Sequence, residues 1–399
     1  MRARLVVVLG LVAAACGSTA SPNAAARHDI LYVDRATDTA VLDADTGAER
    51  IALPAGIATA DWSHYWSVEP SGDSTAVHAI DATSAATTRT FSVAGRFALP
   101  GVYGAAPSGL SANGQWLVLA AAHAPGAGAT SRFAVVDLVN ARLARTITAA
   151  GDYTFDAVSD DGRNVYLIEH LDSATQYRVR VANREGGGVA ADPIVDIKVA
   201  APSMNGIFHS AVADPHGQWQ FGLYFNPTKG PFIHALNTTQ LYAQCILALP
   251  DGGAGVRAMW SMVMDAPGGH LYVVNGAAGI VTDVGPTTLA IARWNTQLVP
   301  PVATTARAPR HGAVLSTDGT RLYVVGETGI LAIQTADLSL KARYLDGVAV
   351  RSLSLSPDGQ RLYVLAEDGV VTRLEAATGR PLGTFGAARA VALMRVETR

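Results

Sequence analysis

Short runs of β-branched and aromatic residues recur through most of the chain, and turns that contain Asp-Gly or Asn-Gly separate them. The pattern is clearest in LSTDGTRLYVV from Leu315, LSPDGQRLYVL from Leu355 and MDAPGGHLYVV from Met264. An apolar run, a glycine-containing turn and a second apolar run together predict a β-hairpin. Further Gly and Asp turns follow, as in residues 367–369 and 375–379, and predict a third and a fourth strand. Repeated units of four antiparallel strands, with no helical stretch between them, predict an all-β protein that forms a single β-propeller.

The number of repeats predicts the number of propeller blades. Aligning the second strand of each unit gives eight positions: Tyr32, Trp66, Leu117, Tyr166, Gln220, Tyr272, Tyr323 and Tyr363. The unit at Trp66 is weak because Asp-Trp-Ser at residues 61–63 replaces the usual turn. Without that unit, however, 85 residues would separate Tyr32 from Leu117, which is more than one blade needs. Eight blades are therefore favoured, with seven as the alternative.

The two ends of the repeat region complement each other. The first unit, from Ile30, lacks an opening strand, whereas residues 388–396 (ARAVALMRV) form an opening strand with nothing after it. We expect the C-terminal strand to join the N-terminal blade, because this closes the ring and removes exposed sheet edges. Residues 28–399 are thus predicted to form one propeller domain.

The first residues of the chain have the layout of an export signal. Two arginines precede an apolar run that is too short to span a bilayer, and small residues lead to Cys16. We expect residues 1–15 to be a signal peptide and residues 16–27 a lipidated N-terminus and flexible tether. The segment VAAAC resembles the lipobox of bacterial lipoproteins, which implies lipidation of Cys16 and a cell-envelope protein held to the membrane by its lipid anchor alone. The alternative is a soluble secreted or periplasmic protein.

Composition narrows the range of functions. The chain has 399 residues, only 16% of them charged, and a formal net charge of −3, so there is no basic surface of the kind that binds nucleic acid. Two cysteines cannot form a four-thiolate zinc site or a disulfide framework. The usual signatures of metalloproteases, nucleotide-binding loops and serine hydrolases are missing as well. We therefore expect neither a metal nor a cofactor, and assign no catalytic residue.

The repeated phrase S-x-D-G-x-x-LYV, followed by D/E-x-x-TG, resembles the YVTN-type repeats of bacterial extracytoplasmic propellers related to quinoprotein amine dehydrogenases. The likeness is best over residues 315–333 and 355–374 and weakens toward the N-terminus. It implies a fold shared by ligand-binding scaffolds, lactone-hydrolysing enzymes and quinoprotein dehydrogenase subunits. A fold alone does not choose among these functions.

One column of the aligned repeats carries candidate ligand-binding residues. His209, His311 and Arg351 stand eight residues before the turn glycine, and Arg389 takes the same place in the last strand. This column marks the entrance of each innermost strand, so the four side chains are predicted to ring one mouth of the central channel and to bind a small anionic ligand. The alternative is that each side chain only bonds loop carbonyls. The acidic residues nearest to this column are Asp61, Asp156 and Asp265.

Two functions follow from these observations. The favoured one is a non-catalytic scaffold that binds a protein partner or a small anionic ligand over its loop face and channel mouth. The other is an enzyme, either a lactonase-like hydrolase or a quinoprotein-associated protein, that acts on a small acidic or lactone substrate.

Overall fold

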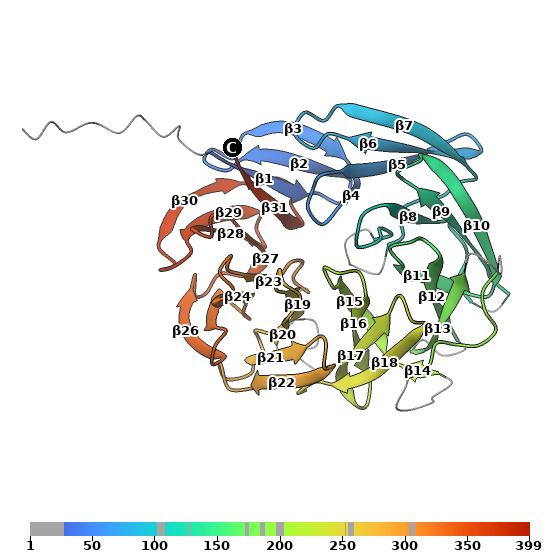
Figure 1. Ribbon diagram of the computed structural model, residues 1–399. Helices are drawn as coiled ribbons and strands as arrows, with labels where there is room; N and C mark the ends of the chain where they lie inside the picture. The colour runs from blue at the N-terminus through green and yellow to red at the C-terminus, as the bar shows by residue number, and fades with distance from the viewer. Residues whose placement is uncertain are drawn as a thin grey trace, which may run out of the picture.

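The computed structural model describes residues 28–101, 108–126, 128–171, 175–183, 188–196, 203–251, 253, 259–302 and 308–399. Within these residues every regular element is a β-strand, and eight small sheets follow one another around a central axis (Figure 1). The predicted all-β propeller with eight blades is therefore confirmed. The predicted signal peptide and tether, with Cys16, lie outside the described residues. No helix in the described ranges has the length and hydropathy to cross a membrane.

The strands are assigned to the blades in chain order. Blade 1 contains β1 (Asp29–Asp34), β2 (Asp38–Asp43), β3 (Glu49–Pro54) and the C-terminal β31 (Ala392–Thr398); blade 2 contains β4 (Gly56–Ala58), β5 (Tyr65–Ser71), β6 (Ser74–Ile80) and β7 (Thr87–Ala94); blade 3 contains β8 (Trp116–Ala120), β9 (Thr130–Asp137) and β10 (Arg142–Ala150); and blade 4 contains β11 (Tyr153–Val158), β12 (Asn164–His170), β13 (Gln176–Asn183) and β14 (Met204–Asn205).

The second half of the ring is more regular. Blade 5 contains β15 (Ile207–Ala213), β16 (Trp219–Asn226), β17 (Gly230–Asn237) and β18 (Tyr242–Ala248); blade 6 contains β19 (Trp260–Met264), β20 (Leu271–Asn275), β21 (Ile280–Gly285) and β22 (Ala290–Asn295); blade 7 contains β23 (Ala313–Leu315), β24 (Arg321–Val325), β25 (Ile330–Gln334) and β26 (Ser339–Tyr344); and blade 8 contains β27 (Val350–Leu355), β28 (Arg361–Ala366), β29 (Val370–Glu375) and β30 (Pro381–Gly386).

Blade 3 departs from the predicted four-stranded pattern. Its innermost position is taken by two isolated bridges, Leu110 to Leu117 and Ala98 to Ala120, instead of a regular strand. Gly109 adopts a φ of +122°, which an extended strand does not allow, and a carbonyl of this glycine still accepts the backbone N–H of Val118. The blade keeps its place in the ring although its inner edge is irregular.

The repeated Ser-x-Asp-Gly phrase builds the turn between the first and second strands. In blade 7, Ser316 Oγ donates to the Asp318 carboxylate over 2.6 Å, and the same carboxylate accepts the backbone N–H of Thr320 at 3.0 Å. Gly319 has a φ of +70°, where a residue with a Cβ would be strained. The same arrangement recurs at Ser356 and Asp358 in blade 8. The sequence phrase is therefore a self-bonded hairpin turn.

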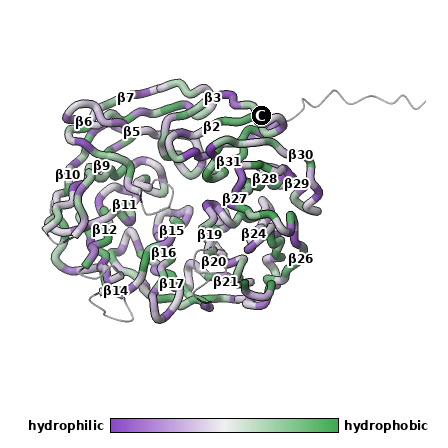
Figure 2. The backbone as a smooth tube through the Cα atoms, turned by 180° about the vertical axis from the view of Figure 1, so that it is seen from behind, coloured by the Kyte–Doolittle hydropathy of each residue, from purple (hydrophilic) through white to green (hydrophobic). Residues whose placement is uncertain are grey.

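In blades 4 and 7 the tyrosine of the second strand ties the blade to the next one. Tyr166 donates its hydroxyl to the carbonyl of Thr238 in blade 5 at 2.9 Å, and Tyr323 donates to the carbonyl of Ala376 in blade 8 at 2.8 Å. Around these bonds the strands pack apolar side chains between neighbouring blades, and hydrophobic stretches follow the strands throughout the ring (Figure 2). The recurring Leu-Tyr-Val run thus supplies both the core and a specific link between sheets.

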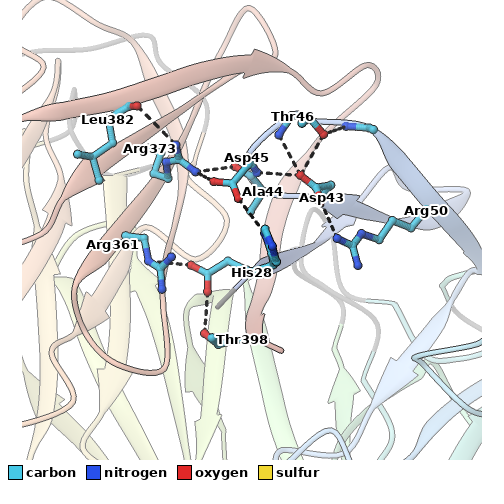
Figure 3. A network of polar contacts seen from close by, with 12 residues as sticks. His28, Asp43, Ala44, Asp45, Thr46, Arg50, Arg361, Arg373, Leu382 and Thr398 are labelled. Atoms are coloured by element: carbon cyan, nitrogen blue, oxygen red, sulfur yellow. Dashed lines mark hydrogen bonds and ion pairs between the residues drawn. The ribbon is translucent and has the colours of Figure 1, made fainter. Parts of the chain in front are cut away.

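The ring closes as predicted, through the pairing of β31 with β1. Asp29 lies almost fully buried at this junction. Its carboxylate accepts a hydrogen bond from Tyr363 at 2.6 Å. It also accepts a hydrogen bond from Thr398 at 2.7 Å and forms an ion pair with Arg361 at 3.1 Å, and these two partners are labelled in Figure 3. Asp45, in the neighbouring β2–β3 turn, contacts His28 and Arg373 at the surface. The closure therefore has a buried polar centre and an exposed polar rim.

Candidate functional site

The innermost strands face the ring axis, and bulges in three of them push single residues out of the sheet. The pairing register shifts at Asp156 in β11, at His209 in β15 and at Arg351 in β27. A bulge leaves its extra residue unpaired and redirects the side chain. All three residues keep part of their surface exposed, and an innermost strand has no strand beyond it on the axial side. The bulges thus create an axial set of polar side chains.

His209 is one of the four residues predicted from the sequence, and it lies in blade 5. Its ring packs edge-on against Phe225, with ring centroids 5.4 Å apart, and its Nδ1 is 3.1 Å from Ser210 Oγ. The aromatic contact fixes the orientation of the imidazole, because an edge-to-face pair has a preferred geometry. Blade 6 separates the strand of His209 from β23 of blade 7 and β27 of blade 8 (Figure 1).

His311 lies in the turn immediately before β23, with a φ of +53°. Its Nδ1 is 2.8 Å from the backbone carbonyl of Leu393 in β31, across the ring closure. A carbonyl can only accept, so Nδ1 carries the proton and Nε2 is left as an acceptor. Loss of hydration lowers the pKa of His311 below its usual value. His311 therefore presents a neutral, basic nitrogen.

The two predicted arginines are each held by a carboxylate. Arg351 donates from Nε to Glu367 at 3.1 Å and from a terminal nitrogen to the carbonyl of Ala390 at 3.0 Å. Arg389, whose side chain is 64% exposed, lies 3.5 Å from Asp38. Glu367 lies 16 residues after Arg351, in the next turn of the same blade, and Asp38 lies at the other end of the chain from Arg389, so the column of aligned repeats indicated neither acid.

A third ion pair lies close to these two. Arg310 contacts Asp34 at 2.9 Å, and its backbone N–H donates to the carbonyl of Arg351. The structure thus brings His311, Arg351 and Arg389 together over blades 7, 8 and 1, but it surrounds their positive charges with an equal number of carboxylates. Binding of an anion by these residues stays a prediction.

Asp156 is an acidic residue of the innermost strand of blade 4. Its carboxylate has no hydrogen bond or ion pair with any described residue, and burial raises its pKa to about 7. Asp61 and Asp265, the two other acidic candidates, bond their own hairpin turns at the opposite mouth, and hydrogen bonds from Ser63 and Thr59 lower the pKa of Asp61 to about 2. An unpaired carboxyl that titrates near neutral pH is typical of a functional site.

The described residues contain no group of three or more His, Cys, Asp or Glu side chains that could hold a metal ion. The axial set therefore offers hydrogen-bonding and proton-transfer chemistry: an acceptor at His311 Nε2, an imidazole at His209, and at Asp156 a carboxyl that can donate or accept according to pH. Asp156 lies in β11 and His311 in the turn before β23, and these two strands lie on different sides of the ring axis (Figure 1).

Comparisons with known proteins place the fold in context. No family model and no curated protein matches the sequence. Among solved structures, the dihydro-heme d1 dehydrogenase NirN in complex with DHE has a TM-score of 0.55 and 12% identity, over 93% of this chain and 74% of that one. Apo AztD from Citrobacter koseri has a TM-score of 0.53 and 11% identity, over 93% and 98%. At these identities the likeness shows a shared propeller fold.

Proposed function

We propose that the protein is a membrane-tethered, extracytoplasmic propeller that binds a small polar ligand or a protein partner at its axial mouth. The observation that carries the proposal is Asp156, an unpaired carboxyl at an inner-strand bulge with a pKa of about 7. A carboxylate that is buried without a partner destabilises the folded protein. A ligand that hydrogen-bonds to Asp156 would explain why the chain keeps this residue. His311 Nε2 supplies a second polar contact to the same axis. The fold supports this use, since NirN, which shares it, was solved with DHE bound.

The ligand is expected to carry both donors and acceptors. The ion pairs of Arg351 and Arg389 leave little net positive charge at the mouth, and the remaining groups are a carboxyl and a neutral imidazole. These favour a partner with N–H or O–H groups over a simple anion.

The axial assignment is tested by purifying the protein from its own cell envelope without denaturation and recording native mass spectra. Wild-type protein is expected to retain a bound species that is lost, or bound at least tenfold more weakly, in Asp156→Asn and in His311→Ala. His64→Ala is the matched control, because His64 is an exposed histidine at the opposite mouth. Equal retention in all four proteins would contradict the proposal.

The tether makes a separate prediction. Cys16→Ser is expected to move the protein from the membrane fraction to the soluble extracytoplasmic fraction, because a lipid chain supplies the whole of the anchoring. Fractionation followed by immunoblotting measures the change, with an alanine substitution at the neighbouring Ser18 as the control. Membrane retention of the Cys16 variant would count against lipidation, and a soluble wild-type protein would favour simple secretion.

A hydrolase is the second candidate, and Asp156 also favours it. A carboxyl with a pKa of about 7 is well suited to act as a general base toward a water molecule or as a general acid toward a leaving group. If the axis hydrolyses lactones, activity on a panel of small lactones should follow this pKa and fall at least 100-fold in Asp156→Asn. Activity that survives in that variant, or no activity at all, would leave the binding function alone.

A further inference from the structure

A cleft on the flank of the ring, between blades 3 and 4, is a second place where polar side chains meet open space. It has a volume of about 230 Å³ and is lined by Ala149 and Ala150 of β10, by Tyr153 and Arg180 of blade 4, and by residues 189–191. A cavity of roughly 150 Å³ holds a benzene molecule, so this cleft has room for a small organic molecule and none for a macromolecule. None of its lining residues belongs to the axial set described above, although Tyr153 lies in the same strand as Asp156.

Two arginines line or border this cleft, and they share one carboxylate. Glu169 accepts a hydrogen bond from Arg180 Nε at 2.7 Å and lies 3.9 Å from Arg178. Arg178 pairs directly with Glu169 across β12 and β13, and Arg180 follows two residues later, so all three side chains emerge on the same face of the sheet. The two arginines and the single glutamate together carry a net positive charge.

The guanidinium groups have donors left over. Arg178 Nε is buried with no hydrogen-bond partner, and the bonds of Arg180 are made by Nε to Glu169 and by one terminal nitrogen to the carbonyl of Ala190. The second terminal nitrogen of Arg180 has no partner among the described residues. A buried N–H group without an acceptor is costly, so an acceptor from outside the chain would stabilise it.

Tyr153 forms the inner wall of the cleft and is almost fully buried. Burial, together with the negative charge of Glu169 and a hydrogen bond to that carboxylate, raises the pKa of Tyr153, so its hydroxyl stays protonated. Asp192 follows the rim residue Ala191 and is exposed, which places its charge toward solvent. The wall of the cleft itself thus presents donors, a guanidinium and a phenol.

We propose that this cleft is a binding site for a small oxyanion, a carboxylate or phosphate group carried by a molecule of modest size. The planar guanidinium of Arg180 binds two oxygen atoms of such a group in parallel, which an ammonium group cannot do. Glu169 acts as a positioning residue, because it fixes Arg180 through Nε and leaves the second terminal nitrogen, beside the one that reaches the Ala190 carbonyl, for the anion. This site differs from the channel mouth, where the sequence predicts an anion at His209, His311, Arg351 and Arg389.

Calorimetric titration with inorganic phosphate and with succinate, at constant ionic strength, tests the site. We expect saturable binding of at least one of the two by wild-type protein, and a loss of tenfold or more in affinity in Arg180→Gln. Arg163→Gln is the matched control, because Arg163 is an exposed arginine of the same blade that pairs only with Asp161. Phosphate bound without succinate indicates a phosphate ligand, and the reverse indicates a carboxylate.

A second variant keeps the test decisive if Arg180→Gln disturbs folding. Ala191→Phe places a bulky side chain at the exposed rim of the cleft and leaves every arginine in place. It should also abolish binding while the circular dichroism spectrum stays that of the wild type. The proposal is overturned if neither anion binds saturably, or if Arg180→Gln and Ala191→Phe bind as tightly as the wild type.

Discussion

Replacing Asp29 by alanine is expected to lower the free energy of unfolding by about 3 kcal/mol, because the ring closure loses its buried acceptor. Asp29 is 2% exposed and accepts from Tyr363 and Thr398 while it pairs with Arg361. Without it, the Tyr363 hydroxyl is left buried with no acceptor. The junction joins the N-terminal and C-terminal strands, so its loss also weakens the contact that holds the ring shut.

Urea denaturation followed by tryptophan fluorescence measures this effect. Asp45→Ala is the matched control, since Asp45 belongs to the exposed rim of the same closure and its side chain is 43% exposed. Surface ion pairs contribute about 0 to 1 kcal/mol, so this control should unfold near the wild-type midpoint. Equal destabilisation by the two substitutions would show that the buried carboxylate has no special part in closing the ring.

Replacing Asp156 by asparagine is expected to stabilise the protein at pH 8 and to leave it unchanged near pH 4. The folded protein raises the pKa of Asp156 from 3.8 to about 7, so folding favours the protonated carboxyl. The protonated carboxyl contributes its full stability to the folded protein below pH 3.8. This stability is lost as the pH rises through 7 and the carboxyl ionises. A difference of about three pKa units corresponds to about 4 kcal/mol at pH 8, which the neutral asparagine recovers.

Denaturation curves at several values of pH between 4 and 8 measure this dependence. The wild-type protein should lose stability across this range relative to Asp156→Asn, whereas Asp192→Asn, a change at an exposed carboxylate, should follow the wild type. Parallel curves for the wild type and Asp156→Asn would mean that the carboxyl has a partner in the folded protein. A gain in stability from loss of a charge, together with a loss of ligand, is the combination typical of a functional residue.

The fold could be predicted from the sequence because each repeat forms its turns through hydrogen bonds between residues that are close together in the chain. The Ser-x-Asp-Gly turns bond to themselves, as at Ser316 and Asp318, so each hairpin can be recognised without its neighbours. All eight second strands, including the weak one at Trp66, lie where the repeat predicts them. The unmatched strand at the C-terminus and the missing strand at the N-terminus predicted the closure between β31 and β1.

The sites could be predicted only in part, because the partners of their side chains lie outside the aligned column. Alignment of the repeats placed His311, Arg351 and Arg389 near one another, but it could not show that Glu367 and Asp38 engage the arginines. Asp156 stood out in the sequence only as an acidic residue on an opening strand. What sets it apart is the absence of a partner and the loss of hydration, and both depend on the surrounding blades. The cleft beside Arg180 could not be predicted either, because residues of both blade 3 and blade 4 form its walls.

The most direct test of the axial assignment is a crystal structure of the protein purified, undenatured, from its own cell envelope. The account predicts ligand or partner density on the ring axis, within hydrogen-bonding distance of the Asp156 carboxyl, and loss of that density in Asp156→Asn. Density for a bound species only on the outer surface of the blades, with Asp156 contacted by nothing but water, would contradict it.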